Sequence, residues 1–131
     1  MRKSALILAA AVLAAPAVAA KPRLTGEEQL AKLLEGREAG QPVSCINLTA
    51  ANETRVIDKT AIAYKVGSTW YVNRPSNAAS LDNDDVLVTR THSSQLCRLD
   101  TVRLHDRSSF WFSGFVGLQD FVPYRKVAMA N

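Results

Sequence analysis

Apolar positions near the start of the chain follow the spacing of a helix. Leu30, Leu33 and Leu34 recur at three- and four-residue intervals and form one stripe. A T-x-x-E capping box at residues 25–28 precedes them, a pattern that satisfies free backbone N–H groups of a first helical turn. The pattern predicts a helix over residues 26–35 whose leucine stripe packs on the rest of the protein, because so short a helix is marginal alone.

After this head, short runs rich in β-branched and aromatic residues alternate with turn residues. The clearest unit is a hairpin, in which residues 61–66 and 69–73 flank a two-residue Gly67-Ser68 turn. Five further strands are predicted over residues 43–48, 54–58, 86–90, 96–106 and 115–124, and a polar loop over residues 76–85. The last run contains Pro123, which cannot donate to a ladder and indicates a sheet edge or a strand end.

The use of acidic residues supports this division into head and body. All five Glu lie at or before Glu53, whereas all seven Asp lie at or after Asp58. Glu tolerates helix interiors, while Asp favours caps and turns. We therefore expect one mainly β domain over residues 21–131. Its fold is a small antiparallel, partly open barrel or roll of roughly six strands with one N-terminal helix, and a β-sandwich is the alternative.

Residues 1–20 have the pattern of a secretory signal peptide. Arg2 and Lys3 precede an apolar run, and Ala17-Val18-Ala19 supplies a small-x-small cleavage site. An uncleaved anchor is the alternative. Cleavage predicts a periplasmic or secreted protein with no transmembrane span, and it lowers the net charge from +4 to +2. So small a charge argues against a nucleic-acid partner.

Two cysteines, Cys45 and Cys97, remain in the exported part of the chain. Because disulfides persist in oxidising compartments and stabilise small exported domains, we expect these two to pair within one molecule. Two buried free thiols and an intermolecular bond are the alternatives. Pairing would also remove both sulfurs as nucleophiles or metal ligands.

Five short phrases occur in a fixed order along the chain, and these are Cys45-Ile46-Asn47-Leu48, Val56-Ile57-Asp58, Tyr71-Val72-Asn73-Arg74, Leu96-Cys97-Arg98-Leu99-Asp100 and Phe121-Val122-Pro123-Tyr124. Together they resemble a family of small exported proteins of Gram-negative bacteria that is catalogued as a domain of unknown function. The resemblance spans residues 45–126. It implies export and a single domain, and it carries over no activity and no catalytic or binding residues.

Catalytic and metal-binding patterns are weak in this sequence. It has no G-x-S-x-G motif, and His92-Ser93 and His105-Asp106 are neighbours that a strand would point to opposite faces. The oxygen-rich segment 82–85 lacks the glycine and the distal glutamate of a calcium loop, and a solvated turn explains it. We predict no catalytic residues, no metal site and no cofactor.

The densest unusual feature is an aromatic run. Four of the nine aromatic residues fall within residues 110–115, flanked by Ser and Gly that are typical of a hairpin tip. In a strand, Phe110 and Phe112 would face one way and Trp111 the other, so a sheet with one wet face would expose part of the set. The alternative is a tip that folds back and packs on the helix or the barrel end. These three aromatics are the predicted binding site.

The function that these features predict is a non-catalytic binding module of the periplasm or cell envelope. Its partner would be an apolar protein, peptide or lipid. Two alternatives stay open, namely a small hydrolase without assignable residues and a structural or inhibitory partner of another envelope protein.

Overall fold

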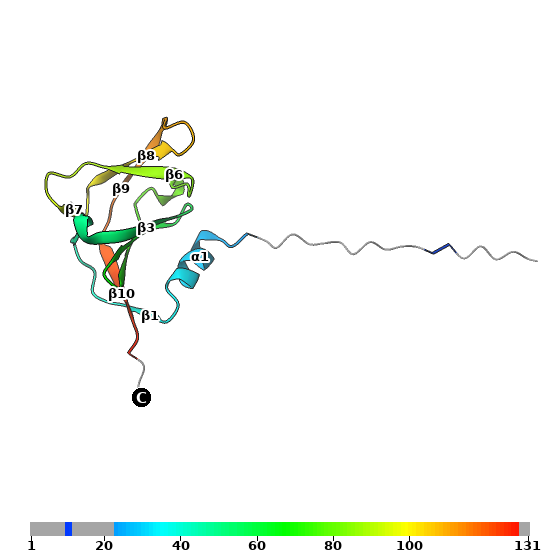
Figure 1. The fold of residues 1–131 in the computed structure, drawn as a ribbon, viewed down its shortest axis with the longest axis horizontal. Coiled ribbons are helices and arrows are strands. Elements are labelled where there is room, and N and C mark those ends of the chain that lie inside the picture. The colour runs from blue at the N-terminus through cyan, green and yellow to red at the C-terminus, as the bar shows by residue number, and fades with distance from the viewer. Residues whose placement is uncertain (1–9, 12–22, 129–131) are drawn as a thin grey trace, which may run out of the picture.

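A computed structural model describes residues 10–11 and 23–128 of the chain (Figure 1). The predicted signal peptide lies outside these residues, apart from residues 10–11. The elements follow in the order α1 (Gly26–Leu33), β1 (Arg37–Ala39), β2 (Cys45–Asn47), η1 (Leu48–Ala50), β3 (Ala51–Ile57), β4 (Ala61–Val66), β5 (Thr69–Asn73), η2 (Ala78–Ser80), β6 (Asp85–Thr89), β7 (Gln95–Cys97), β8 (Thr101–Asp106), β9 (Phe112–Gly117) and β10 (Phe121–Lys126). Here η marks a short 3₁₀ helix.

The strands form three antiparallel sheets. The largest has five strands in the order β1-β10-β5-β4-β3, and the others are β6-β8-β9 and β2-β7. The prediction of a mainly β protein with an N-terminal helix is confirmed. Within the described residues the strand pairing closes no ring, so the fold is an open roll or sandwich with β3 and β6 as free edges.

The helix begins as its capping box predicts. The backbone N–H of Glu28 donates to the Thr25 hydroxyl oxygen over 3.2 Å, which satisfies a free donor of the first turn. The helix ends at Leu33, two residues earlier than predicted, and Gly36 then takes a left-handed φ of 73° as the chain turns into β1. Leu30 is buried against the five-stranded sheet, so the leucine stripe packs as expected.

The predicted hairpin is also present as β4 and β5. Val66 pairs with Thr69 across the turn, and Gly67 has a φ of 61° that a residue without Cβ adopts readily. Strand β4 is buried on both faces, and its alternation sends Ile62 and Tyr64 into one core and Ala61 into another.

Two strands predicted as continuous are each divided. The prediction of one strand over residues 96–106 is wrong, because Leu99 adopts a left-handed φ of 70° between β7 and β8. The Asp100 carboxylate accepts a bond from the Cys97 N–H at 2.7 Å and stabilises this turn. The predicted strand over residues 115–124 is likewise split into β9 and β10. At this second break the Asn73 side chain bonds the Gln119 backbone, accepting from its N–H at 3.0 Å and donating to its carbonyl at 2.7 Å. Polar side-chain bonds thus accompany both breaks.

Pro123 lies inside β10, between β1 and β5, and not at a sheet edge. Its carbonyl accepts a bond from the Gly40 N–H at 2.7 Å. The N and O of a strand residue point to the same side, so the Pro123 nitrogen also faces Gly40. Because proline has no N–H, it cannot donate the second hydrogen bond of this residue pair. The pairing of β1 with β10 ends at Ala39, next to Gly40. The proline therefore ends strand β1, while β10 continues through it.

The predicted disulfide is confirmed. Cys45 on β2 and Cys97 on β7 are bonded to each other and lie directly opposite in the ladder. The bridge joins segments that are 52 residues apart in the sequence and fixes the two-stranded sheet.

Candidate functional site

The hairpin of β8 and β9 ends in a loop that its own polar side chains stabilise. The Asp106 carboxylate oxygen Oδ1 accepts bonds from the backbone N–H groups of Ser108 and Ser109, at 2.8 and 3.0 Å. These bonds, that of Ser109 first, lower the pKa of Asp106 below its ordinary value. The Phe110 N–H donates to the Asp106 carbonyl at 2.8 Å and closes the loop. The local sequence therefore orders the tip without apolar packing.

This closure imposes an unfavourable backbone on an aromatic residue. Phe110 has a φ of 59°, in the left-handed region where a side chain with a Cβ is disfavoured. Glycine would adopt that conformation without strain. The loop thus holds a large aromatic side chain at a position where the backbone conformation favours glycine.

A bulge in β9 then places two phenylalanines on one face. Leu104 pairs with Gly114 and His105 pairs with Phe112, so Ser113 is an extra residue in β9. Residues three apart in a regular strand point to opposite faces. With the bulge, Phe112 and Phe115 oppose His105 and Arg103, two alternate residues of β8, and share the outer face of the sheet.

These features create an exposed aromatic surface. The exposed fractions are 70% for Phe110, 77% for Trp111, 52% for Phe112 and 57% for Phe115. Figure 1 shows the loop, in orange, at the top of the view and away from β1 and β10. The tip does not fold back on the helix or the roll, and Phe110, Trp111, Phe112 and Phe115 are called the aromatic surface below.

An arginine and a histidine ring border this surface. The Arg103 guanidinium carbon lies 5.0 Å from the Phe112 ring centroid, and the His105 ring meets Phe112 edge to face at 6.0 Å. Arg103 forms no ion pair within residues 23–128. The one acid of the loop, Asp106, is bonded to the loop backbone. The surface is consequently apolar, with the Arg103 guanidinium beside it.

Sequence reasoning missed Phe115 and Arg103 as members of this surface. Strand alternation alone separates Phe115 from Phe112, and nothing in the sequence pairs Arg103 with either. One signal could have found the bulge, because a glycine inside a strand, here Gly114, often marks one.

The other predicted chemistry stays dispersed. In segment 82–85, the Asp84 N–H donates to the Asp82 side chain in a turn, while Asp85 is buried and accepts a bond from the Ser113 hydroxyl at 3.0 Å. Among residues 10–11 and 23–128, no three His, Cys, Asp or Glu residues are placed so as to hold a metal.

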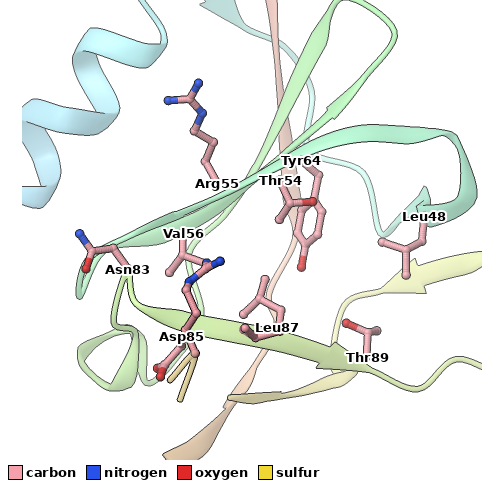
Figure 2. A pocket seen from close by; sticks show the side chains of 11 residues that line it. Leu48, Thr54, Arg55, Val56, Tyr64, Asn83, Asp85, Leu87 and Thr89 are labelled. Carbon is pink, nitrogen blue, oxygen red and sulfur yellow. The ribbon is translucent and has the colours of Figure 1, made fainter. Parts of the chain in front are cut away.

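A second feature lies between the free edges of β3 and β6. A cleft of about 620 Å³ opens there, and Tyr64 lines it from β4 (Figure 2). Tyr64 falls within the predicted strand over residues 61–66, and the sequence gave no sign that its hydroxyl would matter. The one sequence signal was the apolar run Ala61-Ile62-Ala63 before it, which is typical of a buried strand. A tyrosine in such a strand needs a hydrogen-bond partner for its hydroxyl.

No family model, curated protein or solved structure matches this chain. In the described part of the chain no helix is both long and apolar enough to cross a membrane. The resemblance to the exported bacterial family stays a prediction.

Proposed function

We propose that this protein is a non-catalytic binding module of the periplasm or cell envelope, and that its aromatic surface docks a partner protein. The observation that carries the proposal is the joint exposure of four aromatic side chains on one hairpin. Contact with water is unfavourable for apolar area by about 25 cal/mol per Å². A partner that covers these rings would recover that free energy on binding.

The construction of the surface supports a binding role over accidental exposure. Two separate features produce it, the left-handed backbone at Phe110 and the bulge at Ser113. Both work against the stability or regularity of the hairpin, and backbone strain of this kind concentrates at functional sites. Trp and Arg, which are present here as Trp111 and Arg103, are enriched among residues that dominate protein interfaces.

The shape of the surface favours a protein over a lipid bilayer. The aromatic rings continue from the loop onto the outer face of the sheet, where Phe112 and Phe115 flank a shallow hollow with Thr101 and Arg103. A loop tip inserted into a bilayer would use Phe110 and Trp111 and would leave that face unoccupied. The partner should present an apolar patch with a carboxylate placed to pair with Arg103.

The proposed location is supported by two predictions from the sequence and one feature of the structure. The first is the signal-peptide pattern of residues 1–20, and the second is the resemblance to exported bacterial proteins. The third is the disulfide between Cys45 and Cys97, a bond that persists in oxidising compartments.

Site-specific photocrosslinking in cells tests the proposal. A photoreactive phenylalanine analogue replaces Trp111 in one variant and Lys32, an exposed residue on α1, in a matched control. Position 111 should form an adduct with one protein, and Phe115→Ser in the same chain should abolish that adduct. Position 32 should form none with that protein.

Binding of the purified proteins completes the test. The crosslinked protein should bind the wild-type chain, and Phe115→Ser should weaken the affinity about tenfold or more. The absence of a protein adduct at position 111 would refute the proposal. Flotation with vesicles of phosphatidylethanolamine and phosphatidylglycerol, lost in Trp111→Ala, would assign the surface to a membrane instead.

A further inference from the structure

Two strand edges face each other across the cleft. Strand β3 is the last strand of the five-stranded sheet and β6 is an outer strand of the three-stranded sheet. Within the described residues, each pairs with a neighbour on one side only, β3 with β4 and β6 with β8. Figure 2 shows β3 and β6 running along opposite sides of the cleft. Each wall therefore presents backbone N–H and C=O groups that no strand of the described chain pairs.

The cleft has the size and lining of a binding site. Its volume of about 620 Å³ lies within the usual range for ligand pockets. Apolar and polar side chains line the cleft. Leu48, Val56 and Leu87 are apolar, and Thr54 and Thr89 carry hydroxyl groups. Figure 2 shows the Thr54, Leu87 and Tyr64 side chains extending into the space between the two strands.

The cleft also contains a buried polar group without a partner. Tyr64 is only 2% exposed, and its hydroxyl makes no hydrogen bond within the described residues. Buried hydroxyls in folded proteins are nearly always bonded, so an unpaired one calls for a partner. Burial raises the pKa of the Tyr64 hydroxyl, which keeps its proton and can act as a donor. The partner should thus be a hydrogen-bond acceptor that enters through the cleft.

We propose that this cleft binds an extended peptide segment of another protein, which adds a strand between β3 and β6 and accepts a hydrogen bond from Tyr64. A peptide fits better than a compact small molecule because both walls offer rows of main-chain donors and acceptors, which only another extended backbone can satisfy in series. Alternate side chains of the peptide would face the apolar members of the lining, and a carbonyl or amide oxygen would reach the tyrosine hydroxyl.

This site is separate from the aromatic surface. Its lining contains none of Phe110, Trp111, Phe112 and Phe115. The inference therefore stands or fails independently of the proposed function.

A displayed library of random dodecapeptides, selected on the intact exported protein, supplies the probe. Selected peptides should bind the wild-type protein and should slow amide hydrogen exchange in β3 and β6. In one set of peptides the N–H groups of the odd-numbered residues are replaced by N-methyl groups, and in a second set those of the even-numbered residues. One set should lose binding and the other should keep it. That alternation is specific to strand pairing.

The role of the hydroxyl is tested with a matched pair of variants. Tyr64→Phe removes the hydroxyl and keeps the ring, so it should bind the selected peptide about tenfold more weakly. Tyr71→Phe, a change at a partly buried tyrosine outside the cleft lining, should bind as the wild type does. The free Tyr64→Phe protein should melt no lower than the wild type, since the hydroxyl has no partner to lose.

Three results would overturn the inference. They are a library that yields no peptide specific for the protein, a bound peptide that leaves exchange in β3 and β6 unchanged, and binding that is indifferent to N-methylation. If Tyr64→Phe fails to fold, the exchange and N-methylation experiments on the wild-type protein still decide the question.

Discussion

At the scale of single residues, similar side chains have opposite environments in this protein. Trp111 stands in the loop with 77% of its surface exposed, while Trp70 on β5 is 4% exposed and packs in the core beneath α1. The composition of the chain cannot separate them. The difference arises because β5 is an interior strand of a covered sheet, whereas Trp111 follows a loop closed by Asp106.

Truncation of the two tryptophans should separate an exposed residue from a core residue. Trp111→Ala should change the free energy of unfolding by less than about 0.5 kcal/mol, as expected for an exposed side chain. Trp70→Ala should lower it by about 3–5 kcal/mol, because it leaves a cavity. Denaturant unfolding followed by circular dichroism measures both. A loss above about 2 kcal/mol for Trp111→Ala would show that the tip is packed.

Phe110→Gly should raise the stability of the protein and weaken docking. Glycine adopts the left-handed backbone at this position without the cost of about 1–2 kcal/mol that a Cβ imposes, although it loses part of that gain to chain entropy. We expect a net stabilisation of about 0.5–1 kcal/mol in thermal or denaturant unfolding. Phe110→Ala keeps the strain and removes the ring, so it should bind as weakly without the gain in stability.

The order of the loop should depend on pH through Asp106. Its pKa is lowered in the folded state, so the carboxylate bonds are present above the ordinary Asp pKa of about 4 and are lost as the pH falls through the lower folded value. The amide signals of Ser108 and Ser109 in NMR spectra should titrate with that midpoint. Asp106→Asn should abolish the titration, and a midpoint at or above the ordinary value would contradict the assignment.

At the scale of elements, the smallest sheet depends on its covalent bond. Strands β2 and β7 have three residues each, and the disulfide joins the first pair of their register. Two strands this short hold little hydrogen-bonded ladder of their own, although Ile46 and Leu96 bury their side chains in the core. The bridge therefore fixes this sheet at the side of the roll.

Removal of the bridge should cost much of the stability of the domain. Cys45→Ala/Cys97→Ala should lower the free energy of unfolding by about 2–5 kcal/mol, because the unfolded chain regains a long open loop. Denaturant unfolding with and without reductant measures the loss. The double variant should have the same free energy of unfolding in both conditions, because it has no disulfide to reduce. Two free thiols per unfolded, unreduced wild-type chain would contradict the bond itself.

At the scale of the whole molecule, the fold leaves an opening where two sheets meet. The five-stranded sheet ends at β3 and the three-stranded sheet ends at β6, and no strand of the described chain bridges them. The aromatic surface lies on the outer face of the smaller sheet, and the cleft lies at its β6 edge. The fold thus carries two distinct features, an exposed aromatic surface and a cleft, which are the proposed sites for partners.

The exported form should begin after the predicted cleavage site. The basic start, the apolar run and Ala17-Val18-Ala19 predict that the mature chain starts at Ala20 or Lys21. N-terminal sequencing of protein from the periplasm or the medium checks this. An exported chain that still starts at Met1 would contradict it.

The sequence by itself determined the features that depend on near neighbours. The capping box started the helix at Gly26, the Gly67-Ser68 turn set the hairpin, and the aromatic run with its serines produced the tip. Each of these is settled within a few residues, where backbone conformation and local hydrogen bonds dominate.

Only the tertiary structure decided the rest, because it depends on partners far away in the chain. At the first break the Leu99 N–H donates to the Leu118 carbonyl at 3.0 Å, and after Gly117 the Gln119 N–H donates to the Asn73 side chain at 3.0 Å. The alignment of Phe112 with Phe115 follows from a bulge against β8. The cleft that Tyr64 lines exists because β3 and β6 do not pair with each other. Strand pairing is a long-range choice, and apolar spacing along one segment does not encode which edges stay free.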